Sequence, residues 1–431
     1  MKKSTICVTC QTGAFLVLSL VGLIACNDQI KNTVTSTVND PVYLSYIEFR
    51  ATKALQPAQA MVHPGKICLF GNYLYVNEIS KGIHIIDNTY PATPTAVAFI
   101  DLLGNIDVTI SNNILYADSF VDLVMFDVSN PLKPVEVGRA PDVFPNVLPA
   151  TGNNFPIREI DWSKGVVVDW EVKSITEKEE FYPYHPCRGC YFLESAYLSS
   201  WSSSGRLTSS GSTFTSVTGS MSRFAVSNNH LYVVNNNLLK TFSLYGNAVH
   251  KEHEQYLSWN VETVFPYNEK LFLGTTSGML IYDIENPKTP RQLSSITHIL
   301  GCDPVVVQDD YAYVTIRGGN VCGQNQSFLN VYNISNPAAP IFTASYDLNN
   351  PYGLGIDGNT LFVCDGGLAI YDASNPLTIG SRVIKRFSSI QGFDVIPYHG
   401  VLILIGNDGL YQYDYTDIQN IKELGSIKIS K

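Results

Sequence analysis

The stretch that decides the fold is Leu123-Val-Met-Phe-Asp-Val-Ser-Asn-Pro131, a short apolar strand that ends in Asp and runs into Asn-Pro. Proline closes such a strand because it has no backbone N–H to donate to a neighbouring strand. The asparagine before it favours a turn or an extended conformation. Close copies begin at Leu280, Leu329 and Leu368, and a looser copy begins at Ile83. The chain is therefore built from a repeated unit.

A second strand of each unit gives the spacing of the repeat. Its anchor residues are Leu74, Leu115, Leu231, Leu271, Ala312, Leu361 and Leu402. Successive anchors lie 41, 116, 40, 41, 49 and 41 residues apart. Four strands with their turns in about 40–45 residues make one propeller blade. The strands are rich in Val, Ile, Tyr and Phe, and helical periodicity is absent. The sequence therefore predicts an all-β propeller of seven four-stranded blades.

The interval of 116 residues between two of these anchors is too long for one blade. We interpret it as a large insertion after the second blade, over residues 141–221, because no comparable anchor occurs near position 156. A degenerate eighth blade is the alternative, since residues 157–161 and 165–172 have the composition of strands. Residues 42–50 also resemble a strand, one that could close the ring beside the last blade.

The first residues have the features of an export signal. Lys2 and Lys3 precede an apolar stretch from Ala14 to Ala25, which is too short to span a bilayer as a permanent helix. The next residue is Cys26. Residues 1–25 are therefore predicted to be a signal peptide.

The end of this signal, Leu23-Ile-Ala-Cys26, resembles the lipobox of bacterial lipoproteins. The resemblance implies that the thiol of Cys26 carries a lipid. Residues 26–41 are then the lipidated cysteine and a polar, flexible tether. The propeller, with its insertion, is expected over residues 42–431.

The repeated Leu-x-Ile/Val-Tyr/Phe-Asp-x-Ser-Asn-Pro unit resembles the LVIVD repeat of bacterial and archaeal surface-exposed propeller proteins. The segment Gly219-Ser-Met-Ser-Arg-Phe224, just ahead of Leu231, is also similar to a segment of the lipoprotein members of that group. The resemblance covers about residues 60–430 apart from the insertion. It implies propeller architecture and exposure at the cell surface, and it implies no defined reaction.

The charge of the chain limits its partners. The formal charge is −10, and it becomes −12 when the two lysines of the signal peptide are removed. Binding to nucleic acid needs clustered cations that neutralise phosphates. We therefore expect no nucleic acid as a partner.

Two cysteine pairs are candidates for disulfides, which an exported chain can hold. Cys302 and Cys322 are predicted at the same end of one hairpin, where a bridge would contribute about 3 kcal/mol. Cys187 and Cys190 form a CxxC sequence, which we interpret as a local structural disulfide. Half a metal site and a redox pair remain alternatives for this CxxC.

The remaining cysteines of the mature chain lie in two different blades. Cys68 and Cys364 each fall inside a predicted strand. We therefore expect them to be buried free thiols.

Aromatic residues concentrate in the insertion. They are Trp162, Trp170, Trp201, Tyr182 and Tyr184. Rings on loops above a rigid scaffold could contact a sugar or a peptide, because they stack at low entropic cost. Alternatively, they pack the insertion against the blades, which is the interpretation we favour.

A ring of charged residues is predicted at the mouth of the central channel, at the start of each innermost strand. Its members are Lys66, Asp107, Arg223, Glu262, Asp303 and Asp394. Four carboxylates against two cations could hold a divalent cation or a polar ligand. We favour a solvated mouth whose charges screen one another. No cofactor is predicted, and a divalent cation at the mouth stays an open alternative.

The sequence contains no Gly-x-Ser-x-Gly elbow, no His-Glu-x-x-His helix and no phosphate-binding glycine loop. It therefore favours a non-enzymatic binding or protein-interaction scaffold. We expect an outer-membrane lipoprotein that faces the periplasm or the cell surface and binds an envelope protein or a glycan. The alternative is a propeller hydrolase that acts on glycans or lactones with a metal in its channel.

Overall fold

The structure is a computed structural model, and it describes residues 33–51, 55–178, 203–204, 215–246, 248–297, 304–318 and 326–429. The chain forms two compact units. Of the described residues, 33–40, Phe155–Arg158 and 171–178 belong to the smaller unit, and the others belong to the larger unit. Each unit is described by itself.

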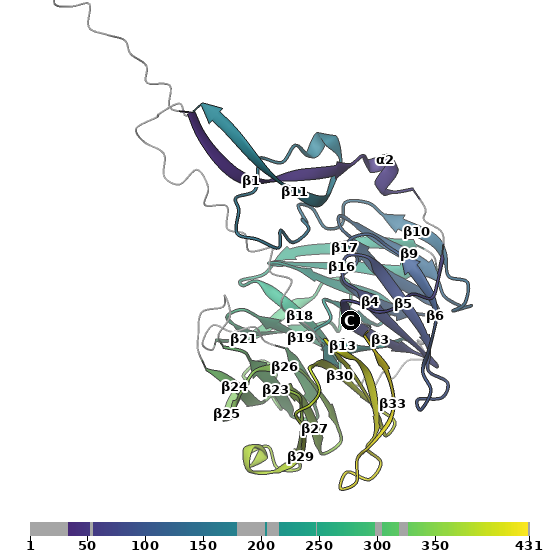
Figure 1. Ribbon diagram of the computed structural model, residues 1–431. Coiled ribbons are helices and arrows are strands. Elements are labelled where there is room, and N and C mark those ends of the chain that lie inside the picture. Colours follow the sequence, from purple (N-terminus) through teal and green to yellow (C-terminus); the bar gives the residue numbers. More distant parts are fainter. Residues whose placement is uncertain are drawn as a thin grey trace, which may run out of the picture. The chain divides into compact units, whose positions relative to one another are not determined.

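In the larger unit, the described residues form seven four-stranded antiparallel blades (Figure 1). Blade 1 has β3 Pro64–Phe70, β4 Tyr73–Glu78, β5 Gly82–Asp87 and β6 Thr95–Asp101. Blade 2 has β7 Val108–Ser111, β8 Ile114–Ser119, β9 Asp122–Asp127 and β10 Val135–Ala140. Blade 3 has β14 Phe224–Ser227, β15 His230–Asn235, β16 Leu238–Tyr245 and β17 Ala248–Tyr256. Blade 4 has β18 Val261–Tyr267, β19 Lys270–Thr275, β20 Gly278–Asp283 and β21 Arg291–Thr297.

The second half of the ring follows the same order. Blade 5 has β22 Val305–Gln308, β23 Tyr311–Ile316, β24 Ser327–Asn333 and β25 Ile341–Leu348. Blade 6 has β26 Pro351–Asp357, β27 Thr360–Asp365, β28 Leu368–Asp372 and β29 Val383–Phe387, with a short 3-10 turn at Ile379–Ser381. Blade 7 has β30 Gly392–Tyr398, β31 Val401–Gly406, β32 Gly409–Asp414 and β33 Lys422–Lys428. The prediction of seven four-stranded blades is confirmed.

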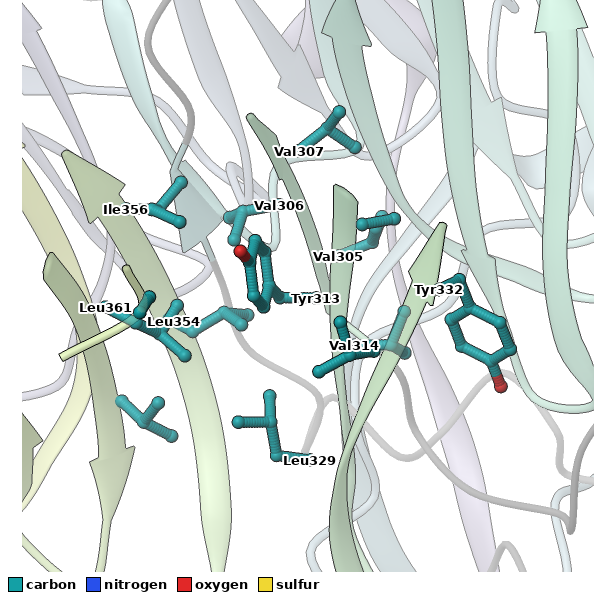
Figure 2. Packing of buried hydrophobic residues seen from close by; sticks show 14 of the residues in the cluster. Val305, Val306, Val307, Tyr313, Val314, Leu329, Tyr332, Leu354, Ile356 and Leu361 are labelled. Carbon is teal, nitrogen blue, oxygen red and sulfur yellow. The ribbon is translucent and has the colours of Figure 1, made fainter. Parts of the chain in front are cut away.

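Burial falls from the innermost strand of a blade to the outermost. Every residue of β3 is buried, whereas every residue of the outermost strand β33 is at least partly exposed. Blades pack face to face through apolar side chains, as Val305 and Val314 of blade 5 do with Leu354 and Leu361 of blade 6 (Figure 2). This packing of blade on blade forms the core.

The Asn-Pro corners explain why the repeat has its sequence. In blade 2, a carboxylate oxygen of Asp127 accepts the N–H of Ser129 at 2.8 Å, and the Asn130 side chain accepts the N–H of Leu132 at 3.1 Å. Such side-chain bonds to the backbone two residues on are typical of Asx turns. A register shift between the third and fourth strands, which marks a β-bulge, recurs in all seven blades.

The proline of these corners also joins neighbouring blades. Three side chains each donate a hydrogen bond to the proline carbonyl of the next blade, and we call these contacts rim latches. They are Tyr232 to Pro287 at 2.9 Å, Ser294 to Pro337 at 2.7 Å and Tyr346 to Pro376 at 2.7 Å. They link blades 3 to 4, 4 to 5 and 5 to 6.

The ring closes between blades 7 and 1 without a shared strand, since each of these blades is built from one end of the folded chain. The side-chain amides of Asn88 and Gln412 exchange two hydrogen bonds across this seam, at 3.0 and 2.6 Å. Apolar residues from both blades share one cluster, in which Leu74 and Ile403 are buried. Side chains therefore hold the seam.

The expected strand over residues 42–50 is confirmed only for residues 42–44, which end the strand β1, and its expected place beside the last blade is wrong because β1 belongs to a separate two-stranded sheet. The strand β1 ends at Leu44, and the short helix α2 Tyr46–Phe49 follows. Ser45 begins this helix with a capping box: its hydroxyl accepts the N–H of Glu48 at 3.2 Å, and the Glu48 carboxylate accepts the N–H of Ser45 at 3.1 Å. The Ser-x-x-Glu spacing was a signal for this helix.

Residues 33–41 of the expected tether lie in β1 Thr33–Leu44, which pairs with β11 Val166–Lys178. In the smaller unit, Asp40 accepts from Arg158 and Lys173 at 2.9 Å each, and Lys173 first, then Arg158, lowers the pKa of Asp40. The β-branched residues of β1 favour a strand once a partner is present. That partner comes from far along the chain, so the local sequence suggested a tether.

The long interval between blades 2 and 3 contains no eighth blade within its described residues. It contains β11, a 3-10 turn at Trp162–Lys164, β12 Ser203–Ser204 and β13 Val217–Ser220. The last two join the sheet of blade 1 at its inner edge. The insertion therefore reaches the central channel.

Candidate functional site

The predicted ring of charged residues lies at the start of the innermost strands. Its described members are Lys66, Asp107, Arg223, Glu262 and Asp394, while Asp303 lies outside the described residues. Lys66, Asp107 and Asp394 are buried; the exposed fractions of these three residues are 6, 1 and 0 %. Glu262 is half-buried. The expectation of a solvated mouth is therefore wrong for the three buried members.

Lys66 and Asp107 form a buried ion pair, with 2.7 Å between the Lys66 Nζ and a carboxylate oxygen. The same carboxylate accepts the hydroxyl of Ser222 at 3.1 Å and the backbone N–H of Arg223 at 2.5 Å. Burial lowers the pKa of Lys66, and the charge of Asp107 opposes that shift. A buried ion pair is stable only when additional donors satisfy the remaining lone pairs of its carboxylate. Here the Ser222 hydroxyl and the Arg223 N–H are these donors.

Asp118 extends this cluster, although the sequence did not single it out. Its carboxylate accepts the Arg223 guanidinium at 2.6 Å and the N–H groups of Ile106 and Asp107 at 2.7 and 2.8 Å. It lies near the end of the second strand of its blade, and acidic residues also end the second strands of blades 1 and 6. An alignment of these strand ends would have revealed it.

The insertion enters the channel as β13, which pairs antiparallel with the innermost strand β3. Val217 lies opposite Leu69, and Thr218 lies opposite Cys68. β12 pairs with the other edge of β13. β13 lies among the innermost strands at the centre of the ring (Figure 1). Protein chain therefore fills the channel at this level.

The segment around β13 is hydrogen-bonded to several blades. Three of its serines accept a backbone N–H, two through the hydroxyl and Ser222 through its carbonyl. They are Ser216 from Ile110 of blade 2, Ser220 from Leu354 of blade 6 and Ser222 from Val264 of blade 4, at 2.8, 3.0 and 2.8 Å. Serine suits the positions of Ser216 and Ser220 because its short hydroxyl takes up little space and can accept the backbone N–H groups of the innermost strands.

Asp394 of blade 7 packs against the same segment. A Cβ on Gly219 would lie 1.8 Å from an Asp394 carboxylate oxygen, so only glycine fits opposite it. One carboxylate oxygen accepts the N–H of Val395 at 2.7 Å, and the other has no hydrogen-bond partner in the described part of the chain. Burial raises the pKa of Asp394 well above its usual value, which favours the protonated carboxyl. We call Lys66, Asp107, Asp118, Arg223 and Asp394 the axial cluster.

The carboxylates of this channel are used within the protein. Asp107 and Asp118 accept from Lys66 and Arg223, as described above. In the part of the chain that the structure describes, no three His, Cys, Asp or Glu side chains gather into a group that could hold a metal ion. The described residues therefore give a divalent cation at the mouth no set of ligands.

Two of the predicted ligand-contact rings are described. Trp162 and Trp170 are both half-buried. The indole N–H of Trp170 donates to the carbonyl of Pro149 at 2.7 Å, which fixes the orientation of that ring. The other candidates, Trp201, Tyr182 and Tyr184, lie outside the described residues.

Some of the cysteines singled out in the sequence are described by the structure, and others are not. Cys68 and Cys364 are buried free thiols, as predicted. Burial raises the pKa of Cys68 to about 12, so its thiol is unreactive. The lipidation and disulfide candidates lie outside the described residues; they are Cys26, Cys187, Cys190, Cys302 and Cys322.

A second buried polar cluster lies in blade 1. The Glu78 carboxylate accepts the N–H groups of Val62 and His63 at 3.0 and 2.6 Å and contacts Nε2 of His84 at 2.9 Å. Burial alone would raise the pKa of Glu78, but these hydrogen bonds outweigh it and the pKa is lowered. Because His84 is 1 % exposed, we assign this cluster a structural role.

No helix among the described residues has the length and apolarity needed to cross a bilayer. The blades and the filled channel place the chain in a structural class: it is a seven-bladed β-propeller with an insertion in its channel. No curated protein matches its sequence.

Solved structures with a similar fold come from several sources. A putative 6-phosphogluconolactonase from Bacteroides fragilis matches with a TM-score of 0.50 at 7% identity, over 85% of this chain and 96% of that one. BamB from Moraxella catarrhalis matches with a TM-score of 0.45 at 8% identity, over 79% and 81%. PorZ, an essential bacterial surface component of the type-IX secretion system of Porphyromonas gingivalis, matches with a TM-score of 0.47 at 9% identity. That match covers 86% of this chain but only 39% of the PorZ chain. These likenesses concern the fold alone.

The repeat itself identifies the kind of propeller. The LVIVD repeat model matches residues 64–100, 106–142 and 302–348, which correspond to blades 1, 2 and 5. The chain is therefore a seven-bladed β-propeller with LVIVD repeats in three of its blades, as the repeated strand and its Ser-Asn-Pro ending indicated.

Proposed function

We propose that this protein is a non-enzymatic scaffold that binds an envelope protein or a glycan. The observation that carries this proposal is the occupied channel, in which β13 pairs with β3 and the charges are matched internally. A small-molecule site needs a concave pocket with polar groups that converge on the ligand. Among the described channel residues, Asp107 and Asp118 are already paired with Lys66 and Arg223, so loops and outer surfaces are the better candidates for binding.

The insertion supplies side chains suited to such a contact. Trp162 and Trp170 are partly exposed, and the Trp170 ring is held in place by its hydrogen bond to Pro149. A ring that is already oriented loses little entropy on binding, which favours its use as an anchor. We therefore place the contact surface on the insertion.

Anchoring in the outer membrane is the second part of the proposal. It rests on the lipobox-like end of the signal and on Cys26. Each buried methylene of an acyl chain contributes about 0.8 kcal/mol, so two or three chains hold a protein firmly. In cells, Cys26→Ser should move the protein from the membrane fraction to the soluble fraction and abolish incorporation of labelled fatty acid. Retention of the label by Cys26→Ser would refute this part.

Cross-linking in cells followed by pull-down of the full chain tests the scaffold. We expect a protein or glycan partner that is captured by the native chain and lost in a Trp162→Ala/Trp170→Ala variant. The matched control is Tyr90→Ala on blade 1, whose ring is 73 % exposed and which should capture normally. Equal capture by both variants would contradict the assignment to the insertion.

The alternative is a hydrolase acting on glycans or lactones with a metal in the channel. It would require channel carboxylates free to bind a cation, whereas Asp107 and Asp118 are paired. Absence of any partner in the pull-down, together with a stoichiometric divalent ion that is lost in Asp303→Asn/Asp394→Asn, would favour the hydrolase over the scaffold.

A further inference from the structure

The closure of the ring raises a physical question. Blades 7 and 1 share no strand, and their described seam contains the amide pair of Asn88 and Gln412 together with apolar packing. A circular array of blades is only as stable as its weakest junction, because one open junction exposes two apolar faces. An element that contacts several blades, including blades 7 and 1, would stabilise this junction.

The segment Thr215–Ser222 spans the blades in this way. Through β13 it pairs with blade 1, and its serines bond to blades 2, 4 and 6. At Gly219 it packs against Asp394 of blade 7. It therefore touches both sides of the seam, blade 1 through the hydrogen bonds of a strand and blade 7 through a close fit.

The fit at Asp394 is specific for a neutral side chain. The carboxylate oxygen that faces Gly219 is buried and has no hydrogen-bond partner among the described residues, so a charge there would be desolvated. The charged groups that act on Asp394 from the adjoining strands are Lys66 of β3 and Asp107 beside β7. The thiol of Cys364 in β27 also interacts with Asp394, and burial raises the pKa of this thiol well above its usual value, so it stays neutral. Lys66 is already paired with Asp107 at 2.7 Å, and the described residues of β13 carry no charge.

We propose that Thr215–Ser222 is the closure element of the propeller, which fastens the blades along the axis, and that its docking requires a proton on Asp394. In this view the insertion has an internal role as well as an external one. The proposal is independent of the partner and of the lipid anchor, because it concerns only residues of the ring.

The coupling has a defined sign. In the unfolded chain Asp394 titrates near the ordinary aspartate value of about 3.9. In the folded protein its pKa is raised, so the folded state holds more protons above that value. Stability therefore falls as pH rises from the ordinary pKa to the raised one. Lys66, whose pKa is lowered, contributes the opposite slope at alkaline pH, and this contribution is common to the native chain and its Asp394 variants.

Thermal unfolding of the full chain between pH 4 and pH 8 tests the proton. Asp394→Asn keeps the shape of the side chain and has no proton to lose. Its stability should fall less steeply with pH than that of the native chain. Within the window, the two folding equilibrium constants should diverge by up to about tenfold per pH unit. Parallel profiles for the two proteins would overturn the requirement for a proton.

A pair of glycine variants tests the closure. Gly219→Ala places a methyl group on the Asp394 carboxyl, whereas Gly246→Ala in blade 3 meets no atom within 4 Å and only strains the backbone at φ 56°. We expect Gly219→Ala to lower the Tm by at least about twice as much as Gly246→Ala. It should also speed hydrogen exchange at residues 215–222. Equal losses in Tm with unchanged exchange would show that the segment does not close the ring.

Discussion

The rim and the axis of this propeller are held by different kinds of contact. At the rim, a hydroxyl of one blade donates to the proline carbonyl of the next, and this latch recurs from blade 3 to blade 6. At the axis, the contacts are buried, charged and used once, as in the pairing of Lys66 with Asp107 and of Arg223 with Asp118. The rim is repetitive, and the axis is unique.

This difference separates two tasks in building a ring. A latch that is the same at each junction lets blades add to one another, but it fits any number of blades. Contacts that occur once can join only particular blades, because an unmatched buried charge is costly. We infer that the repeat drives growth of the ring and that the axial cluster and β13 specify its closure.

The largest effect should come from breaking the axis. Lys66→Met would leave the buried Asp107 carboxylate with only the more distant Arg223, whose Nε lies 3.9 Å away, and we expect a loss of about 3–5 kcal/mol in the free energy of unfolding. Denaturant unfolding measures this loss. The control is Lys288→Met, whose ion pair with Glu252 is half exposed and should be worth less than about 1 kcal/mol. Similar losses in both variants would contradict the claim that contacts at the axis contribute more to stability than contacts at the rim.

A smaller effect should follow from opening one rim latch. Tyr346→Phe removes the 2.7 Å hydrogen bond to the Pro376 carbonyl and the hydrogen bond that the hydroxyl accepts from the backbone of Ile379, so we expect a cost of about 1–2 kcal/mol. The exposed Tyr90 serves as the control, since Tyr90→Phe should leave the unfolding midpoint unchanged. A cost comparable to that of Lys66→Met would mean that the latches, too, determine closure.

The smallest effect should come from the outer surface of blade 4. Arg291 pairs with Asp283 at 3.0 Å, but its side chain is 71% exposed. Arg291→Gln should change the free energy of unfolding by no more than about 0.5 kcal/mol, and added salt should reduce the difference further. A change above 1 kcal/mol would show that exposed charges at the rim matter more than their geometry suggests.

The fold could be predicted because the sequence pattern of a blade recurs several times along the chain. The strand that ends in Asp-x-Ser-Asn-Pro recurs, and anchors such as Leu74 and Leu402 are completely buried in equivalent second strands. The seam was not predictable in the same way. It depends on Asn88 and Gln412, which lie at opposite ends of the folded chain and are amides at positions where the close copies of the repeat have other residues.

The site was predicted only in part. Lys66, Asp107 and Asp394 were found because they occupy equivalent positions in successive blades. Their burial was missed, because the strand that covers them has the sequence Val217-Thr-Gly-Ser220, which resembles a polar loop. Its strand conformation depends on partners in several blades, and these partners cannot be predicted from the local sequence. Asp118 was missed because it belongs to the second strand rather than the first.

The uninterrupted blades have a consequence for the order in which the chain folds. Each blade is one continuous stretch of sequence, so most of its contacts are local, which favours rapid folding. Residues 215–222 are the exception, since they bond backward to blades 1 and 2 and forward to Leu354, and they pack against Asp394. In a chain that emerges from its N-terminus, β13 can join β3 before the last blades exist. Those blades would then assemble against a strand that is already in place.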